Sequence, residues 1–397
     1  MDKTLADLIK ISNTTGRNPA LTQAAGGNTS VKTDNGKFMF IKASGTALKD
    51  MNAHRGWRKL RLDKVHGVIK DKKLAKLPTA KREPQITARL LTSCCDCFTG
   101  TIRPSVEANL HALLDKCVIH LHPLVIGAYV NSKKGRVEII KLFKSEKYPP
   151  LWIPYAPPGF PLAIKTSRLV TAYEKHYSKK PAIMFLAKHG LFVTAKTAPD
   201  AMRLLHKVLN RCENNLPRLK TLRLKPPAAK KILEVKSAIQ KAVINTTGQH
   251  LPVTFIYNNE IAHFINRPDA AKLLTMGPLE PAEMVYVNGT PMWVETPSPA
   301  KIASGMKKIV RQGNKPVSAF LVKGIGLFIA ADKKTAPIVK DFATGTILVR
   351  LWASHFGGLV PLTKNEQNFV KRWYLAAPQP TKRKSLRAKR SNLRSQH

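Results

Sequence analysis

Two histidines separated by one residue carry the clearest chemical signal in this 397-residue sequence. They lie in the segment 117–123, which reads CVIHLHP. Residues i and i+2 of a strand share one face, so His120 and His122 would present their imidazoles side by side. Adjacent imidazoles on an apolar strand indicate a divalent metal ion, for which Zn²⁺ is the usual occupant. The alternative is a pair of partly exposed histidines at a strand end.

A third histidine could complete such a metal site. His189 follows the apolar run 182–187 and precedes Gly190, so it lies at the expected end of a second strand. From there it could supply a third ligand, although this position also suits a capping or core histidine. Three protein ligands with one open position are typical of catalytic zinc, whereas structural zinc is enclosed by four.

One glutamate has a sequence position that suits acid–base chemistry. Glu107 follows Pro104 and Ser105, which together are typical of a helix start. In the first helical turn a carboxylate is favoured by the helix dipole alone. Beside a metal, the same carboxylate could act as a general base. His111 lies four residues further on the same face, where packing or support of the site is its expected role.

Two short loops have the composition of a phosphate-binding site. They are 26–30, which reads GGNTS, and 42–46, which reads KASGT. Glycines allow close backbone approach, while backbone N–H groups and hydroxyls can donate to a phosphate. Lys32 and Lys42 could add positive charge. Neither loop matches a P-loop or a complete dinucleotide-binding fingerprint.

The elements expected to position these residues alternate between strands and helices. Short buried strands are predicted at 37–43 and 117–124, where apolar runs lie between turn signals. Helical spacing of apolar residues predicts helices at 106–114 and 197–209. This mixture indicates a layered α/β domain.

The chain is predicted to divide into four parts. The chemical signals all lie in residues 1–216, the expected catalytic α/β domain. A basic linker or helix at 217–240 contains Pro226-Pro227, which marks the joint. A second α/β lobe is expected at 241–376, and a disordered basic tail at 377–397.

One internal similarity links the first domain to the second lobe. Residues 185–199 read FLAKHGLFVTAKTAP and residues 320–337 read FLVKGIGLFIAADKKTAP. Both predict a strand, a glycine-containing turn, a second strand and a helix start, so the second lobe is either a degenerate related half or a chance likeness. His189 in the first copy corresponds to Ile325 in the second. Any chemistry of this histidine therefore belongs to the first lobe alone.

The cysteines offer a weaker signal. The segment Cys94-Cys95-Asp96-Cys97 contains one C-x-x-C spacing without a second pair. A helix packed through its small thiols is expected there rather than a metal site. Five cysteines in a chain of this length also argue against a disulfide framework.

The overall charge suggests an anionic partner but no particular one. Against 67 Lys and Arg stand 24 Asp and Glu, a formal net charge of +43. An apolar fraction of 43% excludes a wholly disordered chain, and the absence of an 18-residue apolar run excludes a spanning helix. No nucleic-acid-binding motif is recognisable, and the basic tail could bind polyanions without specificity. The first ten residues do not resemble a signal peptide, which predicts a cytoplasmic protein.

The motifs, taken in order, resemble one known family. The order is GGNTSVK, IKASGT, RPSVEANLH, VIHLHPL, PYAPPG and AKHGLFVTA. It is similar to the class II aldolase/adducin family. The stretches LFKSEKYPPLWIPYAPPGFPLA and GPLEPAEMVYVNGTPMWVE look most like the aldolase part of bifunctional rhamnulose-1-phosphate aldolase/short-chain dehydrogenase proteins. No dehydrogenase part is present in the chain.

The resemblance implies a fold and a set of residue roles. The fold is a three-layer α/β/α arrangement with a largely antiparallel central sheet, in a homo-oligomer that is often a tetramer. The implied roles are Zn²⁺ ligation by His120, His122 and His189, acid–base catalysis by Glu107, proton donation by Tyr155, and phosphate binding by Gly27, Asn28, Ser44, Gly45 and Ser105. In some family aldolases the tyrosine matched by Tyr155 reaches a neighbouring subunit's site. Val106 departs from the family pattern, which often has a second serine there.

The activity implied by the resemblance is that of a Zn²⁺-dependent class II aldolase. It would cleave a ketose 1-phosphate, similar to rhamnulose 1-phosphate, into dihydroxyacetone phosphate and an aldehyde through a metal-stabilised enediolate. The same family also contains epimerases, dehydratases and adducins, which are non-catalytic interaction modules. These remain alternatives at the level of the sequence.

Overall fold

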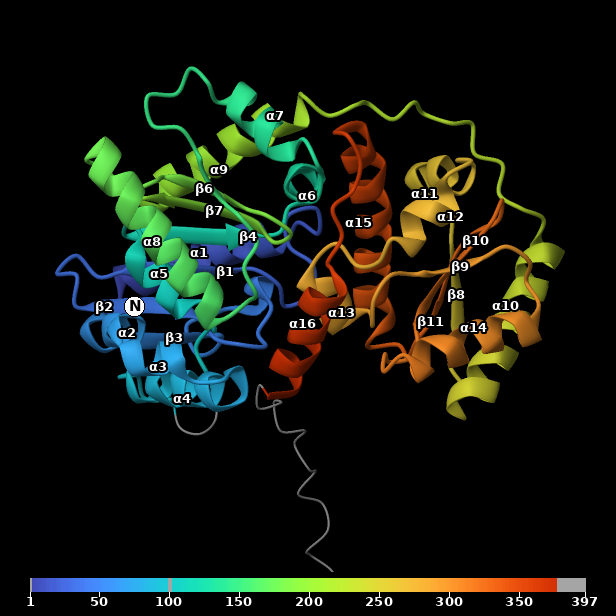
Figure 1. The fold of residues 1–397 in the computed structure, drawn as a ribbon, viewed down its shortest axis with the longest axis horizontal. Coiled ribbons are helices and arrows are strands. Elements are labelled where there is room, and N and C mark those ends of the chain that lie inside the picture. Colours follow the sequence, from blue (N-terminus) through green and yellow to red (C-terminus); the bar gives the residue numbers. More distant parts are fainter. Residues whose placement is uncertain (1, 99–101, 377–397) are drawn as a thin grey trace, which may run out of the picture.

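The larger of two sheets lies in the N-terminal half of the chain in the computed structural model, which describes residues 2–98 and 102–376 (Figure 1). Its strands are β1 (Asn28–Lys32), β2 (Phe38–Lys42), β3 (Trp57–Arg61), β4 (Cys117–Leu121), β5 (Leu151–Ile153), β6 (Ile183–Leu186) and β7 (Gly190–Ala195). They lie in the order β3-β2-β1-β4-β7-β6-β5. Only β5 and β6 run parallel, so the predicted largely antiparallel central sheet is confirmed.

Helices cover both faces of this sheet. On one face lie α1 (Lys3–Gly16), α6 (Leu124–Val130), α7 (Gly135–Leu142) and α9 (Ala198–Glu213). On the other lie α2 (Leu62–Lys70), α4 (Thr79–Thr92), α5 (Ala108–Leu113) and α8 (Phe160–Tyr177). The short elements η1 (Leu48–Asp50) and α3 (Lys72–Lys76) complete this lobe. The resulting layers are helix, sheet and helix, as expected for a mixed α/β fold.

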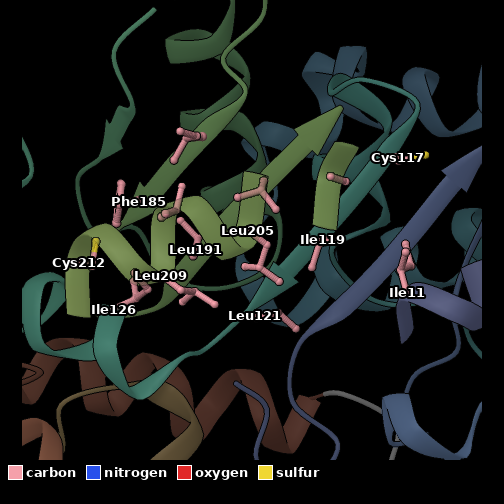
Figure 2. Packing of buried hydrophobic residues seen from close by; sticks show 14 of the residues in the cluster. Ile11, Cys117, Ile119, Leu121, Ile126, Phe185, Leu191, Leu205, Leu209 and Cys212 are labelled. Carbon is pink, nitrogen blue, oxygen red and sulfur yellow. The ribbon is translucent and has the colours of Figure 1, made fainter. Parts of the chain in front are cut away.

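Strand β4 shows how the two faces are separated. Ile119 and Leu121 pack with α1 and α9 in one core (Figure 2), whereas Val118 packs in the core on the α8 face. Side chains alternate along a strand, so His120 lies on the same face as Val118. The apolar residues therefore fix the direction in which this histidine points.

The second lobe is built on a smaller sheet. Its strands are β8 (Val253–Ile256), β9 (Met292–Val294), β10 (Ala319–Val322) and β11 (Gly326–Ala330), in the order β8-β11-β10-β9. Its helices are α10 (Ala229–Thr247), α11 (Asn259–Ile265), α12 (Ala270–Thr275), α13 (Pro281–Tyr286), α14 (Pro299–Arg311), α15 (Ala336–His355) and α16 (Lys364–Ala376). Residues 217–228 form no helix or strand and join the two lobes. The predicted basic tail at 377–397 lies outside the described residues.

The second sheet repeats half of the first. The order β4-β7-β6-β5 corresponds strand for strand to β8-β11-β10-β9, with the same antiparallel and parallel pairings. The turns also match, since Leu186 pairs with Gly190 and Val322 pairs with Gly326. This correspondence supports the interpretation of the second lobe as a degenerate related half.

The strand registers extend this correspondence to single residues. Phe192 pairs with His120 in the first sheet, while Phe328 pairs with Phe255 in the second. Counting two residues further along each strand matches His122 with Tyr257. The three histidines of the first lobe thus correspond to Phe255, Tyr257 and Ile325, none of which is a ligand for a metal such as zinc at neutral pH.

The two lobes pack directly against each other. Helix α15 lies against α6, and α16 reaches back to α4 (Figure 1). A bridge between Ser132 and Leu359 and an ion pair of 2.8 Å between Lys188 and Glu366 cross the boundary. No helix among the described residues has the length and apolar character needed to cross a bilayer.

The prediction of a thiol-packed helix at 94–97 is wrong. This segment is not helical: Cys94 forms a bridge with Leu60 of β3, and Cys95 and Cys97 are exposed. The buried group is instead Asp96, which pairs with Arg58 at 2.9 Å while both side chains are at most 5% exposed. An ion pair with a residue of β3, far away in sequence, determines the local structure.

A buried ion pair stabilises the second lobe. Arg350 of α15 is fully buried, donates to the carbonyls of Leu273 and Gly277, and lies 3.5 Å from Glu283. Glu283 also accepts from Thr346 at 2.7 Å. Backbone and side-chain groups of the protein thus contact both members of the pair, which offsets the cost of burying it, although Arg350 Nε has no partner among the described residues.

Replacing this arginine is expected to destabilise the protein strongly. Arg350→Ala would leave the Glu283 carboxylate buried without its cation, at a cost of about 3 kcal/mol in the free energy of unfolding. Urea denaturation followed by circular dichroism measures this loss. Lys323→Ala removes an exposed partner of Glu295 and is the control, for which a change below about 1 kcal/mol is expected. Equal losses in the two variants would contradict the assigned role of burial.

Candidate metal centre and active site

The three predicted histidine ligands come together at one end of the central sheet. His120 is in β4, His122 directly follows that strand, and His189 lies in the turn between β6 and β7. Gly190 allows the turn that carries His189 to lie close to the end of β4, where His122 is. A Cβ at this position would overlap the Leu121 carbonyl oxygen and lie 2.8 Å from the His122 ring. Any larger residue would therefore push the two histidine-bearing segments apart.

The imidazoles are arranged around a common point. The Nε2 atom of His120 lies 3.1 Å from that of His122 and 3.3 Å from that of His189. One ligand nitrogen from each ring lies within 4.8 Å of the other two. A tetrahedral ion with bonds of about 2.0–2.1 Å holds its nitrogen ligands roughly 3.3 Å apart. The residues therefore fit a divalent metal such as zinc.

The surroundings of these rings favour their neutral, ligand-competent form. The Nδ1–H group of His120 donates to the Leu191 carbonyl at 3.0 Å, which leaves the Nε2 lone pair free for a ligand bond. The ring stacks on Phe192 at 4.1 Å. Burial lowers the pKa of His120, His122 and His189 below the usual value. Three lone pairs facing one another are stabilised best by a cation.

Glu107 lies beside the same point, as the sequence predicted. It immediately precedes α5 and is 8% exposed. Its two carboxylate oxygens lie 3.3 Å from His120 Nε2 and 3.4 Å from His189 Nε2. A carboxylate at this place can serve either as a further ligand or as a base for a bound substrate.

A chain of buried side chains holds this carboxylate in place. Asn28 Nδ2 donates to Glu107 Oε2 at 2.6 Å, and Asn28 Oδ1 accepts from His111 Nε2. His111 Nδ1 in turn accepts from the Ser30 hydroxyl at 2.8 Å. The Asn28 side chain, predicted to bind phosphate, is thus committed to Glu107. His111 supports the site without reaching the metal position.

The role of this amide can be tested by substitution. Asn28→Ala removes the donor to Glu107 and leaves His111 without its acceptor, so the carboxylate loses its fixed orientation. If Glu107 is the base that the family resemblance implies, proton exchange in dihydroxyacetone phosphate should slow roughly 10- to 100-fold, with the metal content unchanged. Exchange is measured by NMR in deuterium oxide. An unchanged rate would assign Asn28 a purely structural role.

The other predicted phosphate-binding residues lie on adjoining segments. Ser44 and Gly45 are exposed in the loop after β2. The Ser44 N–H donates to the Arg103 carbonyl, and the Ser105 N–H donates to the Lys42 carbonyl. The loop is thereby joined to the segment that leads into Glu107. Gly27 adopts a φ of +63°, and a Cβ there would lie 2.8 Å from the His120 carbonyl oxygen.

Lys42 is buried near the carboxylate rather than exposed to solvent. Its ammonium donates to the Ala25 carbonyl at 3.0 Å. Burial lowers the pKa of Lys42 to about 8, while Glu107 opposes the shift. The protonated lysine therefore places a positive charge in the protein interior, close enough to interact with Glu107.

Tyr155 is not placed within the histidine cluster. Its hydroxyl is buried and has no hydrogen-bond partner among the described residues, and the Lys188 ammonium lies 5.1 Å from its ring centre. Burial, with a smaller contribution from Glu366, raises its pKa above the usual value. Its hydroxyl therefore keeps its proton at neutral pH.

A cavity beside the histidines is bounded by both lobes. The first lobe contributes polar side chains at Gln23, His122, Asn131 and His189, and the second contributes Glu280, Glu283, Asp341 and Thr346. Sequence reasoning assigned no function to Glu280 or Asn131. The motif GPLEPAEMVYVNGT contains Glu280, but only the packing of the lobes brings it to this cavity.

Known proteins resemble this chain at different levels. Residues 6–216 match the family of the Class II Aldolase and Adducin N-terminal domain. A curated relative, the uncharacterized oxidoreductase YuxG of Bacillus subtilis, is 23% identical over 422 residues, covering 94% of this chain and 58% of the relative. The chain thus spans little more than half the length of that relative. The relative is named as an oxidoreductase, so the closer likeness to a rhamnulose-type aldolase stays a prediction.

Solved structures resemble a little more than half of the chain. The N-terminal class II aldolase domain of a Thermoplasma acidophilum protein is 27% identical, with a TM-score of 0.44, over 54% of this chain and 94% of that one. An L-fuculose-1-phosphate aldolase of Thermus thermophilus is 16% identical, with a TM-score of 0.33, over 54% and 93%. The family match covers more than half of the 397 residues. The chain therefore belongs to the class II aldolase and adducin family.

Proposed function

We propose that this chain is a divalent-metal-dependent aldolase that cleaves a ketose 1-phosphate into dihydroxyacetone phosphate and an aldehyde. One observation carries the proposal: three imidazole nitrogens converge on a point that also has the Glu107 carboxylate beside it. A purely structural metal site has no use for a free carboxylate at this position. A substrate similar to rhamnulose 1-phosphate is proposed from the sequence resemblance.

The histidines His120, His122 and His189 would hold the ion, for which we propose Zn²⁺. Three nitrogen ligands and an open position are the donor set of catalytic zinc. When bound, such an ion polarises the substrate ketone and offsets the negative charge of the enediolate that carbon–carbon cleavage produces. The chain uses no lysine Schiff base in this proposal.

Glu107 would transfer the proton at the reacting carbon. In the condensation direction it removes a proton from the hydroxylated carbon of dihydroxyacetone phosphate, and in cleavage it returns that proton to the enediolate. Asn28 holds the carboxylate toward the cluster through its 2.6 Å hydrogen bond. A water molecule, or Tyr155 reaching the site from a neighbouring subunit, would protonate the aldehyde oxygen during condensation and take the proton back during cleavage.

The substrate phosphate would bind on the side of the exposed loop after β2. Ser44 and Gly45 offer hydroxyl and backbone donors there, and Ser105 joins them through the adjoining segment. Gly27 allows the loop before β1 to lie close to the histidine strand. The positive net charge of the chain would raise the local concentration of an anionic substrate.

The proposal is tested by incubating the purified protein with ketose 1-phosphates in the presence of Zn²⁺. Release of dihydroxyacetone phosphate, coupled to a reductase that consumes it, is the expected result. Exchange of the dihydroxyacetone phosphate proton with solvent deuterium tests the same chemistry without an aldehyde. An epimeric or dehydrated sugar phosphate as the only product would overturn the aldolase assignment. Metal binding without any turnover would favour an interaction module.

A further inference from the structure

The cavity beside the histidines contains polar groups that no step above uses. Two of them are the carboxyl groups of Glu280 and Asp341, both from the second lobe. A third is the Asn131 side chain, which follows α6 of the first lobe. All three line the same space as His122 and His189.

The backbone that carries Glu280 is fixed at three successive positions. The Arg350 guanidinium donates to the Gly277 carbonyl at 2.7 Å, and the Leu362 N–H donates to the Pro278 carbonyl at 2.8 Å. The Leu279 N–H donates to the Glu283 carboxylate at 3.3 Å. Two buried charged side chains thus hold the segment that leads into Glu280. A rigid support of this kind is typical of residues that must meet a ligand in a set geometry.

The Glu280 carboxyl itself makes no hydrogen bond or ion pair with any described residue. It occupies the cap position of α13 without capping that helix. Burial and the neighbouring Glu283 raise the pKa of Glu280 to about 8, so at neutral pH it can donate one hydrogen bond as well as accept others. The residue is only partly exposed, so its carboxyl group borders the cavity without a partner in the described part of the protein and is open to a ligand.

Asn131, on the first-lobe side of the cavity, has a buried polar atom without a partner in the part of the chain that the structure describes. The residue is 2% exposed, and its Nδ2 donates to the Gly127 carbonyl at 2.9 Å. Its Oδ1 is buried with no hydrogen-bond partner among the described residues. Within the described ranges, the cavity is therefore lined by a buried acceptor without a partner from one lobe and by a partly exposed carboxyl without a protein partner from the other.

We propose that the second lobe completes the substrate pocket, and that Glu280 together with Asn131 binds a hydroxyl group of the aldehyde half of the substrate. A hydroxyl can donate to Asn131 Oδ1 while it accepts from or donates to the carboxyl group. The inference rests on the proposed aldolase function. It assigns the second lobe a part in substrate selection, although that lobe has no metal ligands of its own.

The charge of the cavity adds a second element of selectivity. Glu280, Glu283 and Asp341 all come from the second lobe, and only Glu283 has an arginine partner among the described residues. No lysine or arginine of the described chain lines the cavity, so a second phosphate on the aldehyde half would meet these carboxyl groups without a cation to pair with. The pocket thus selects an uncharged, hydroxylated aldehyde.

The test compares aldehydes that differ by one hydroxyl group. Condensation of dihydroxyacetone phosphate with 2-hydroxypropanal and with propanal is measured for the Zn²⁺-loaded protein and for Glu280→Leu and Glu280→Gln. We expect the leucine variant to lose about 10- to 100-fold in kcat/KM for 2-hydroxypropanal, with little change for propanal. The glutamine variant, which keeps a donor and an acceptor, should lose less. Glu295→Gln changes an exposed carboxylate of the same lobe and is the matched control.

Two further measurements separate the possible failures. Proton exchange of dihydroxyacetone phosphate needs no aldehyde. It therefore shows whether the part of the site around Glu107 is active in each variant. Wild-type protein without exchange would contradict the proposed function and this inference with it. Exchange in all variants, combined with equal losses for both aldehydes or with no loss, would overturn the role of Glu280 alone. The melting temperature of Glu280→Leu should not fall, because the carboxyl has no partner to lose.

Discussion

His122→Ala is expected to give a folded protein that retains no divalent ion and has no aldolase activity. Two nitrogens remain in that variant, and two ligands do not hold zinc against dilution. Loss of a supporting partner alone typically weakens metal binding 10- to 100-fold, so loss of a ligand should reduce the metal content from about one ion to below about 0.1 per chain. Elemental analysis after gel filtration without chelator measures this content. Aldol cleavage should fall below detection in the same sample.

The control for this result is a histidine outside the cluster. His250→Ala removes an exposed imidazole of the second lobe and should leave both the metal content and the turnover unchanged. Circular dichroism should show the same helix content in both variants. Full metal occupancy and turnover in His122→Ala would show that the cluster is not the catalytic centre.

Glu107→Gln is expected to separate metal binding from catalysis. The amide has nearly the same shape as the carboxylate and can still accept from Asn28, but it cannot take up the substrate proton. The rate of proton exchange in dihydroxyacetone phosphate should fall by roughly 10²- to 10⁴-fold. Because the three histidines are unchanged, the metal content should stay near one ion per chain. The main prediction is therefore that Glu107→Gln keeps its metal but loses exchange, whereas His122→Ala loses both.

The control and the contradictory outcome are both simple to measure. Glu234→Gln alters an exposed carboxylate of α10 and should exchange at the wild-type rate. If Glu107→Gln lost its metal in parallel with its activity, the carboxylate would be a ligand instead of a base. Unchanged exchange would move the base to another residue.

The histidine cluster could be predicted from the sequence because its geometry is largely local. His120 and His122 share a face by the two-residue repeat of a strand, and His189 precedes a glycine that permits close approach. The layers and the antiparallel sheet follow from short apolar runs between turn residues. Glu107 was predicted beside the metal from its place in an ordered set of motifs.

Other parts of the site depend on contacts between distant segments. The Asn28 amide donates to Glu107, which lies 79 positions away in the sequence. The residues next to Asn28 in the sequence give no indication of this hydrogen bond. Glu280 reaches the cavity only because α15 packs on α6 and brings the lobes together. At 94–97 the ion pair of Asp96 with Arg58 overrides the expected thiol packing. In each case a partner far along the chain decides the outcome.

The repeated half-sheet has a thermodynamic consequence. Where the first lobe has His120, His122 and His189, the second has Phe255, Tyr257 and Ile325 in matching register. The apolar set packs without help, whereas the imidazole set gains stability from an ion to an extent set by the ratio of free ion to its dissociation constant. If the proposed ion binds, its concentration would set part of the stability of the first sheet, whereas the second sheet has no ligand set of its own among the described residues. On this proposal, the chain would join a lobe that gains stability directly from a bound ion to a related lobe that gains none of its own.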